Sequence, residues 1–382
     1  MRRLELFRPL AGLLLIPLTG CAQPWLTQEG DFWVRTFHET APAQTRLRIV
    51  SHGPVSLQGN TSGNFDYTVK VSVRARTREQ ARSMLQTALI RSEMQNGWLV
   101  VTTPGGGAMT AVVMRAPRLQ EVVVSSSEGA VEVNNVDGPV TVETGADQVK
   151  VDRIRGNCTL STGGGEIHVG AVEGALHCTT GAGAITAKSV RGVAVLLTNG
   201  GDIDALSIGG AARVETGGGT VHLGFVNGTV TAVNGGGPIL VDQATGIVTT
   251  RNMAGPVRIG EAGGIRCESA NGGIQLGKIH GPMHVSTSVG SIVANLQGSK
   301  LAESYLATGN GDITVLIPSN LGVTISAENR MADSIGRILS DFREVQPQLR
   351  GMRLQAFGRL NGGGPALQIS ASSGTIFLKR TQ

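Results

Sequence analysis

The sequence predicts an all-β fold: a parallel β-solenoid, β-helix-like, of about 18-residue repeats with a small N-terminal βαβ cap. The first observation is composition, because glycine supplies 55 of 382 residues, charged residues 16% and aromatic residues 3%, while 40% of the chain is hydrophobic. The second is a glycine column with a fixed 18-residue step, and the third is a set of apolar columns with the same step. A chain this hydrophobic is expected to fold into a packed structure, so its glycines must lie between packed elements and not in a disordered linker.

The columns define the repeat. The glycine column consists of Gly138, Gly156, Gly174, Gly192, Gly210, Gly228 and Gly246. The first apolar column consists of Val131, Val149, Ile167, Ile185, Ile203, Val221, Ile239 and Val257. The second consists of Val133, Val151, Val169, Ala187, Ala205, Leu223, Val241 and Ile259, after which the step slips by one residue in places. Such periodicity is typical of solenoids, whose units bury their apolar edges only against one another.

Each repeat is expected to carry two short strands. In one unit, Ile167 and Val169 alternate with polar neighbours, and Leu176 and Cys178 form a second alternating pair. Alternation with period two indicates strands. Stacked about 4.8 Å apart, ten or so coils would form a rod about 50 Å long. The sequence leaves open whether the cross-section of this rod has two faces or three.

The two ends depart from the repeat, as open sheet edges require. Upstream, residues 47–50 and 67–73 alternate as strands, Thr77 and Gln80 resemble a helix capping box, and residues 98–102 return to strand. The predicted segments are a lipoprotein signal peptide (1–20), a lipid anchor and tether (21–44), an N-terminal βαβ cap (45–120), the solenoid repeats (121–334), an irregular cap or excursion (335–361) and the final solenoid strands (362–382).

The N-terminus resembles a bacterial lipoprotein signal. Three arginines within the first eight residues precede an apolar stretch that is too short to span a bilayer. The run from Leu18 to Cys21 resembles a lipobox, in which the cysteine receives a diacylglycerol and becomes the new N-terminus. Acyl chains such as palmitate, at about 0.8 kcal/mol per buried methylene, would hold the protein on a membrane. Ala22 resembles the pattern of lipoproteins sorted to the outer membrane in diderm bacteria, so we expect a lipid-anchored protein of the cell envelope.

Three features together resemble the DUF4097 family, also described as adhesin or toastrack domains. They are the repeated signature T-G-G-G-x-[IV]-x-[VL]-x-x-[VI]-x-G, the upstream strand-helix-strand with its helix from Ala81 to Ala88, and the closing G-x-[IV]-x-[LV] strand. The resemblance covers roughly residues 45–380. It implies a β-strand repeat domain on cell-surface or envelope proteins, some linked to envelope-stress signalling, with no catalytic motif to carry over.

The histidines do not predict a metal site. His168 and His222 share an outward column, but at the coil spacing they would lie about 14 Å apart, too far to share an ion. His280 and His284 have no carboxylate or cysteine at ligand spacing. Calcium binding in a β-roll needs a recurring acidic position, yet the position after the glycine cluster varies: Gln148, Glu166, Ala184, Asp202, Thr220 and Pro238. We therefore expect no metal and no cofactor.

The cysteines downstream of Cys21 are expected to be free core thiols. Cys158 and Cys178 would be diagonal neighbours about 8 Å apart, beyond disulfide reach, and Cys267 lies several coils away. The run from Gly235 to Pro238 lacks the lysine and the helix of a phosphate loop, so it should form a corner. A net charge of +5 does not predict nucleic-acid binding, because the basic residues are dispersed and the predicted compartment is the cell envelope.

The sequence favours a nonenzymatic envelope lipoprotein without catalytic residues, whose solenoid presents an extended, adhesin-like surface to an envelope protein or a glycan. Its only predicted site residue is Cys21, which would attach the protein to the membrane through lipid. One alternative is a sensory or scaffolding module in envelope stress. Another is a carbohydrate-active β-helix enzyme, which would need clustered acidic or basic residues on one face, and the outward columns show no such cluster.

Overall fold

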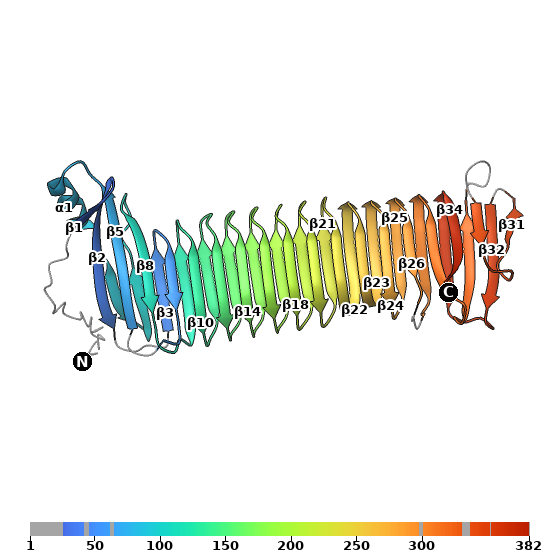
Figure 1. The fold of residues 1–382 in the computed structure, drawn as a ribbon, viewed down its shortest axis with the longest axis horizontal. Helices are drawn as coiled ribbons and strands as arrows, with labels where there is room; N and C mark the ends of the chain where they lie inside the picture. Colours follow the sequence, from blue (N-terminus) through green and yellow to red (C-terminus); the bar gives the residue numbers. More distant parts are fainter. Residues whose placement is uncertain are drawn as a thin grey trace, which may run out of the picture.

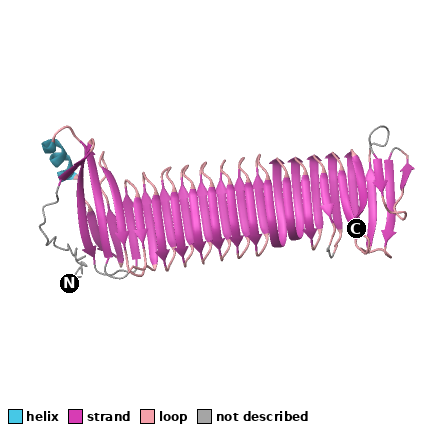
Figure 2. Ribbon diagram, viewed as in Figure 1, coloured by secondary structure: helices cyan, strands magenta, loops and turns pink. Residues whose placement is uncertain are grey.

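The structure is a computed structural model that describes residues 26–41, 46–61, 65–297, 301–330, 337–351 and 353–381. Most of these residues lie in β-strands stacked along one axis, and α1 (Arg78–Thr87) is the only helix assigned within them (Figure 1, Figure 2). The predicted parallel β-solenoid is confirmed, with about 11 turns of repeats of roughly 18 residues. We call residues 26–120 the head, 121–318 the shaft and 319–382 the tail.

Each coil of the shaft contributes one strand to each of two sheets. The first sheet contains β10 (Val131–Val136), β12 (Val149–Ile154), β14 (Ile167–Val172), β16 (Ile185–Val190), β18 (Ile203–Ile208), β20 (Val221–Val226), β24 (Ile274–Ile279), β26 (Ile292–Asn295) and β28 (Ile313–Pro318). The second contains β9 (Glu121–Ser126), β11 (Val140–Thr144), β13 (Cys158–Thr162), β15 (Leu176–Thr180), β17 (Ala194–Thr198), β19 (Ala212–Thr216), β21 (Val230–Asn234), β25 (Met283–Val289) and β27 (Ser304–Asn310). Strands β22 (Ile239–Ala254) and β23 (Val257–Asn271) run through a corner into both sheets. The shaft therefore has two faces, and their inward side chains form one apolar core.

Neighbouring strands pair in parallel at the predicted step. Ile185 lies beside Ile203, and Ile203 lies beside Val221. Ile203 is fully buried, whereas the next residue, Asp204, is exposed. The step shortens by one residue within β22, at a register shift between Ala244 and Ile247. The predicted columns and the predicted slip are both confirmed.

The glycine column permits the coils to stack at their corners. A Cβ atom on Gly156 would lie 2.3 Å from the carbonyl carbon of Gly138 in the preceding coil. No side chain fits in that space without moving the backbone. Glycine is therefore required here by close approach between coils.

A ladder of buried threonines closes the other corner. The Thr180 hydroxyl donates to the carbonyl oxygen of Gly165 at 2.8 Å and accepts from the N–H of Gly183 at 3.2 Å. The same pair of bonds recurs at Thr162, Thr198 and Thr216, and the Asn234 amide replaces the hydroxyl in the next coil. Each side chain satisfies two backbone groups that the corner would otherwise leave unpaired. This explains the threonine of the T-G-G-G signature.

The head closes the first end of the stack. Its strands are β1 (Leu26–Glu29), β2 (Phe32–Ala41), β3 (Arg46–Ser51), β4 (Val55–Gln58), β5 (Phe65–Arg74), β6 (Arg91–Gln95), β7 (Trp98–Thr102) and β8 (Met109–Arg115). Strands β3 and β4 pair with β9 and β10 of the shaft, and β7 and β8 stack outside them although they come later in the chain. Beyond β8, strands β5, β2 and β1 add antiparallel. The predicted helix is present, with Thr77 accepting from the N–H of Gln80.

The tail closes the other end in a related way. Its strands are β29 (Val323–Asn329), β30 (Arg337–Ser340), β31 (Pro347–Arg350), β32 (Arg353–Leu360), β33 (Ala366–Ser373) and β34 (Thr375–Thr381). Strands β33 and β34 stack directly on β27 and β28, while β29 and β30 lie outside them. Strands β32 and β31 then add antiparallel beyond β29, so β31 is an edge strand at the far end of the rod (Figure 1). Residues 335–361, which were expected to be irregular, thus contain three strands, β30, β31 and β32. The last two strands of the chain, β33 and β34, lie between the shaft and the strand pair β29 and β30.

Candidate binding surface

Outward side chains of the first sheet form the ladder that the sequence predicts. Strand pairing places its members side by side in the order Glu132, Lys150, His168, Thr186, Asp204 and His222. All of them are half-buried or exposed. The predicted register is confirmed, and the shaft carries a row of chemically varied side chains.

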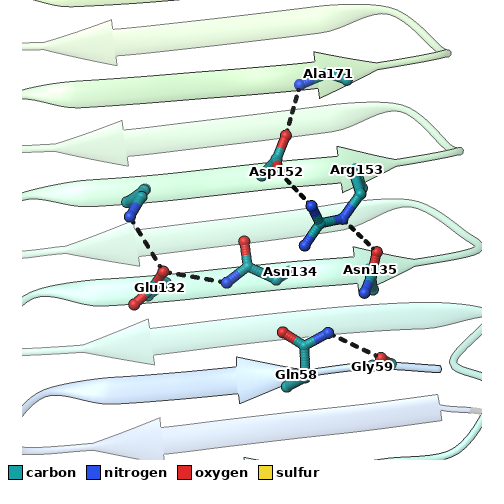
Figure 3. Close-up of polar contacts among 9 residues, drawn as sticks. Gln58, Gly59, Glu132, Asn134, Asn135, Asp152, Arg153 and Ala171 are labelled. Atoms are coloured by element: carbon teal, nitrogen blue, oxygen red, sulfur yellow. Dashed lines mark hydrogen bonds and ion pairs between the residues drawn. The ribbon is translucent and has the colours of Figure 1, made fainter. Parts of the chain in front are cut away.

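Near the head, polar side chains of this face bind one another between coils (Figure 3). Lys150 Nζ lies 3.3 Å from a Glu132 carboxylate oxygen. Arg153 donates to Asn135 Oδ1 at 2.6 Å and pairs with Asp152 at 3.1 Å. Exposed pairs of this kind contribute about 0–1 kcal/mol each. They give the face its polar pattern and add little to its stability.

His222 lies between two carboxylates of neighbouring coils. Its Nδ1 is 2.9 Å from Asp204 Oδ1, and its Nε2 is 3.2 Å from Asp242 Oδ2. Partial burial by itself lowers the pKa of His222, but hydrogen bonds with Asp242 and Asp204 outweigh it and raise this pKa above its usual value. The spacing of the histidines in the sequence does not reveal this arrangement. Asp204 lies one 18-residue repeat before His222 and could have been predicted as its neighbour. Asp242 lies 20 residues after His222, two more than one repeat, so the repeat step does not predict this contact.

Two other histidines considered in the sequence, His168 and His280, also have polar partners. His168 contacts Thr186 of the next coil at 2.7 Å and Glu166 at 3.0 Å. His280 Nε2 lies 2.9 Å from Glu261 Oε1. Glu261 belongs to the preceding coil, so this contact could not be found among the residues that flank His280 in the sequence. Within the described residues, no group of three metal-binding side chains is close enough to hold an ion.

The three cysteines of the shaft are free and buried, as predicted. Cys158 pairs in register with Leu176, and Cys178 pairs with Leu160, so the two thiols are diagonal neighbours. Burial raises the pKa of the Cys158 thiol to about 12 and that of Cys267 to about 11. Such thiols remain protonated at neutral pH and are poor nucleophiles.

The tail carries a groove of about 460 Å³ on its outward side. Strands β29, β31 and β32 and the residue before β31 line it with Ser326, Ala327, Glu328, Gln346, Gln348, Arg350, Gln355, Ala356 and Phe357. The Phe357 ring is 64% exposed. Glu328 pairs with Arg353 at 3.0 Å, whereas Arg350 has no ion pair among the described residues. This site was not predicted because residues 335–361 were expected to be irregular, whereas strands β31 and β32 add antiparallel beyond β29.

Net charge changes sign along the rod. The head has 11 lysines and arginines against 6 acidic residues, the shaft 11 against 17, and the tail 8 against 4. Basic residues are dispersed in short stretches of sequence, as predicted. Summed over the three regions, however, they give basic ends and an acidic shaft.

The predicted signal peptide (1–20) and the predicted lipid site Cys21 lie outside the described residues. In the part that is described, no helix has the length and apolar character needed to cross a membrane.

No protein-family model matches the chain, and a search of curated proteins finds no relative. Among solved structures, a candidate cell adhesion protein of Clostridium sporogenes matches with 10% identity and a TM-score of 0.20, covering 91% of this chain and 100% of that one. A candidate adhesin of Bacteroides fragilis matches with 11% identity and a TM-score of 0.31, covering 63% and 95%. A candidate lipid binding protein of Parabacteroides distasonis matches with 13% identity and a TM-score of 0.26, covering 74% and 96%. At these TM-scores the matches carry no argument for the function of this chain.

Proposed function

We propose that the protein is a nonenzymatic lipoprotein of the cell envelope, anchored through lipid on Cys21, whose solenoid presents an adhesin-like binding surface to an envelope protein or a glycan. Membership of the DUF4097 family is part of this proposal and rests on the repeat signature. The observation that carries the proposal is the outward ladder, because side chains that recur once in every coil form rows along a rod. A partner can be recognised through variation along such rows.

The position of the head supports anchoring at this end. Strand β1 begins at Leu26, five residues after Cys21. Five fully extended residues reach at most about 18 Å, so lipid on Cys21 would hold the head close to the bilayer.

The charge distribution supports an orientation away from the membrane. Anionic lipids attract basic residues close to the surface, by about 1 kcal/mol each, and repel acidic ones. A basic head would therefore approach the bilayer, and an acidic shaft would be held off it. In this orientation the ladders and the tail are available to partners.

The anchor is tested by Cys21→Ala. We expect loss of labelling with a palmitate analogue and reduced partitioning into membranes compared with the wild-type protein, measured by fractionation. Cys158→Ala is the matched control, since this buried cysteine should leave labelling unchanged. Persistent acyl labelling of Cys21→Ala would contradict the proposal.

The extended surface is tested by substitutions along the ladder. Because many weak contacts would add up, each single alanine at Lys150, Thr186 or Asp204 should weaken binding to envelope glycans or proteins only modestly. Deleting residues 167–202, two whole coils, should weaken it far more and leave a folded, shorter rod. A hundredfold loss at one residue, together with turnover of a polysaccharide, would instead indicate an enzyme.

A further inference from the structure

A row of polar and aromatic side chains crosses the second sheet where the shaft meets the tail. Tyr305 on β27 lies beside Gln368 on β33, Gln368 lies beside Ser326 on β29, and Ser326 lies beside Phe357 on β32. The two aromatic residues are 38% and 64% exposed. Three strand spacings of about 4.8 Å separate them by roughly 14 Å. The groove of the tail is the outer part of this row.

A second row of side chains, next to the first, lines the groove with amide and charged groups. Glu328 lies beside Gln355, which lies beside Gln348 on the edge strand. Each glutamine amide offers two N–H donors and one carbonyl acceptor. Arg350 adds a cation that no described carboxylate pairs with, while Glu328 is held by Arg353. The groove thus combines an exposed ring, several neutral hydrogen-bonding groups and the guanidinium of Arg350, which has no ion pair within the described part of the chain.

We propose that the tail groove is a binding site for an acidic polysaccharide. A sugar ring has an apolar face that packs against an aromatic ring such as Phe357, and its hydroxyl groups match the amides of Gln348 and Gln355. The carboxylate of a uronic acid would pair with Arg350, because a guanidinium binds a carboxylate through two parallel hydrogen bonds. This inference rests on the proposed function, because it specifies an acidic polysaccharide as the glycan that the protein binds. It requires neither lipid on Cys21 nor binding along the shaft.

The edge of the tail is poorly suited to a peptide partner. A peptide that adds as a strand needs a free edge with N–H and C=O groups in register. Edge strand β31 has only four residues, and it begins with Pro347, which has no N–H to donate. Gly351, directly after it, has a φ of +62° and ends the extended conformation. Such edges are protected against strand addition.

Charge favours an acidic ligand at the basic tail over the acidic shaft. The tail is basic, so it attracts a polyanion, and the acidic shaft repels one that would lie along it. End-to-end contact between two copies would bring basic regions together and is disfavoured. The acidic polysaccharide should therefore bind end-on.

The test is titration of the purified full-length protein with oligogalacturonate, and with cello-oligosaccharides as the neutral counterpart, by calorimetry. We expect oligogalacturonate to bind and the neutral chain to bind at least tenfold more weakly. Phe357→Ala should weaken binding about three- to tenfold, and Arg350→Gln about ten- to a hundredfold. Both side chains are exposed, so thermal unfolding of these variants should match that of the wild type.

Matched controls on the first sheet are Phe225→Ala, whose ring is 39% exposed, and Arg258→Gln, and both should change affinity less than twofold. Absence of oligogalacturonate binding, equal binding of the neutral chain, or equal losses in the control variants would overturn the proposal. So would binding of unfolded casein that Phe357→Ala and Arg350→Gln abolish, since that would assign the groove to peptides. A dimer that Phe357→Ala dissociates would assign it to a second copy of the chain. Failure of the Cys21→Ala test would leave these results unaffected.

Discussion

The shaft and the two ends use the same strands but order them differently. In the shaft, each coil pairs with the coil that follows it in the sequence. At each end, one coil is inserted out of order: β3 and β4 lie inside β7 and β8, and β33 and β34 lie inside β29 and β30. Antiparallel strands then complete both ends. A periodic sequence is thus sufficient to continue a stack, but ending it requires strands that break the order and cover open edges.

The shaft itself also contains two kinds of coil. In the regular coils, the buried threonines satisfy the corner backbone in full. Where the step shortens by one residue, the buried Ser269 Oγ and Asn252 Oδ1 have no hydrogen-bond partner among the described atoms. The Asn252 amide still donates to the carbonyl oxygen of Gly255 at 2.7 Å, so the polar position is kept there but is only partly satisfied. The irregular coil is therefore expected to be the weaker part of the shaft.

The largest effect should come from exchanging the two sides of one strand. Ile203→Asp would bury an unpaired carboxylate in the apolar core of the shaft, so the free energy of unfolding should fall by several kcal/mol. Asp204→Lys, one residue further on the exposed side, should change the free energy of unfolding by less than about 0.5 kcal/mol. Denaturant unfolding of the full chain measures both. Equal destabilisation would show that the register is wrong.

A medium effect should separate the regular coils from the irregular one. Thr198→Val removes the partner of the Gly183 carbonyl and of the Gly201 N–H, which should cost about 1–3 kcal/mol. Ser269→Ala removes a buried hydroxyl that satisfies nothing, so it should be neutral or stabilising. The same unfolding measurement applies to both variants. A Ser269→Ala variant as unstable as Thr198→Val would remove the distinction between the two kinds of coil.

The smallest effect concerns His222 on the outward ladder. Its pKa is raised in the folded protein, so its contribution to stability is complete below the unfolded pKa of about 6.5 and is lost as pH rises through the folded value. An NMR titration should place the pKa of His222 above about 6.5. Asp242→Asn should lower this pKa, whereas Glu143→Gln on the other sheet should leave it in place. A pKa that is unaffected by Asp242→Asn would contradict the observed contact.

Much of the shaft could be predicted because its information is local and repeated. The columns of Ile203 and Val131, the corner glycines and the free thiols all follow from one step length, since neighbouring coils pair at a constant offset. The role of the threonine ladder could not be read from alternation. A polar residue at an inward position is stable only when backbone groups satisfy it, and the carbonyl that does so belongs to the preceding coil.

The sequence by itself determined the solenoid class, the 18-residue register and the inward and outward columns. Only the tertiary structure decided that the shaft has two faces, which coils lie inside the ends, and which side chains meet in the groove of the tail. The contact of His222 with Asp242, which lies off the repeat step, and the register of Ser326 with Phe357 depend on strand order and on local changes in coil length. Hydrophobic period fixes which side of a strand faces the core, but it is the same for every coil and cannot rank one stacking order above another.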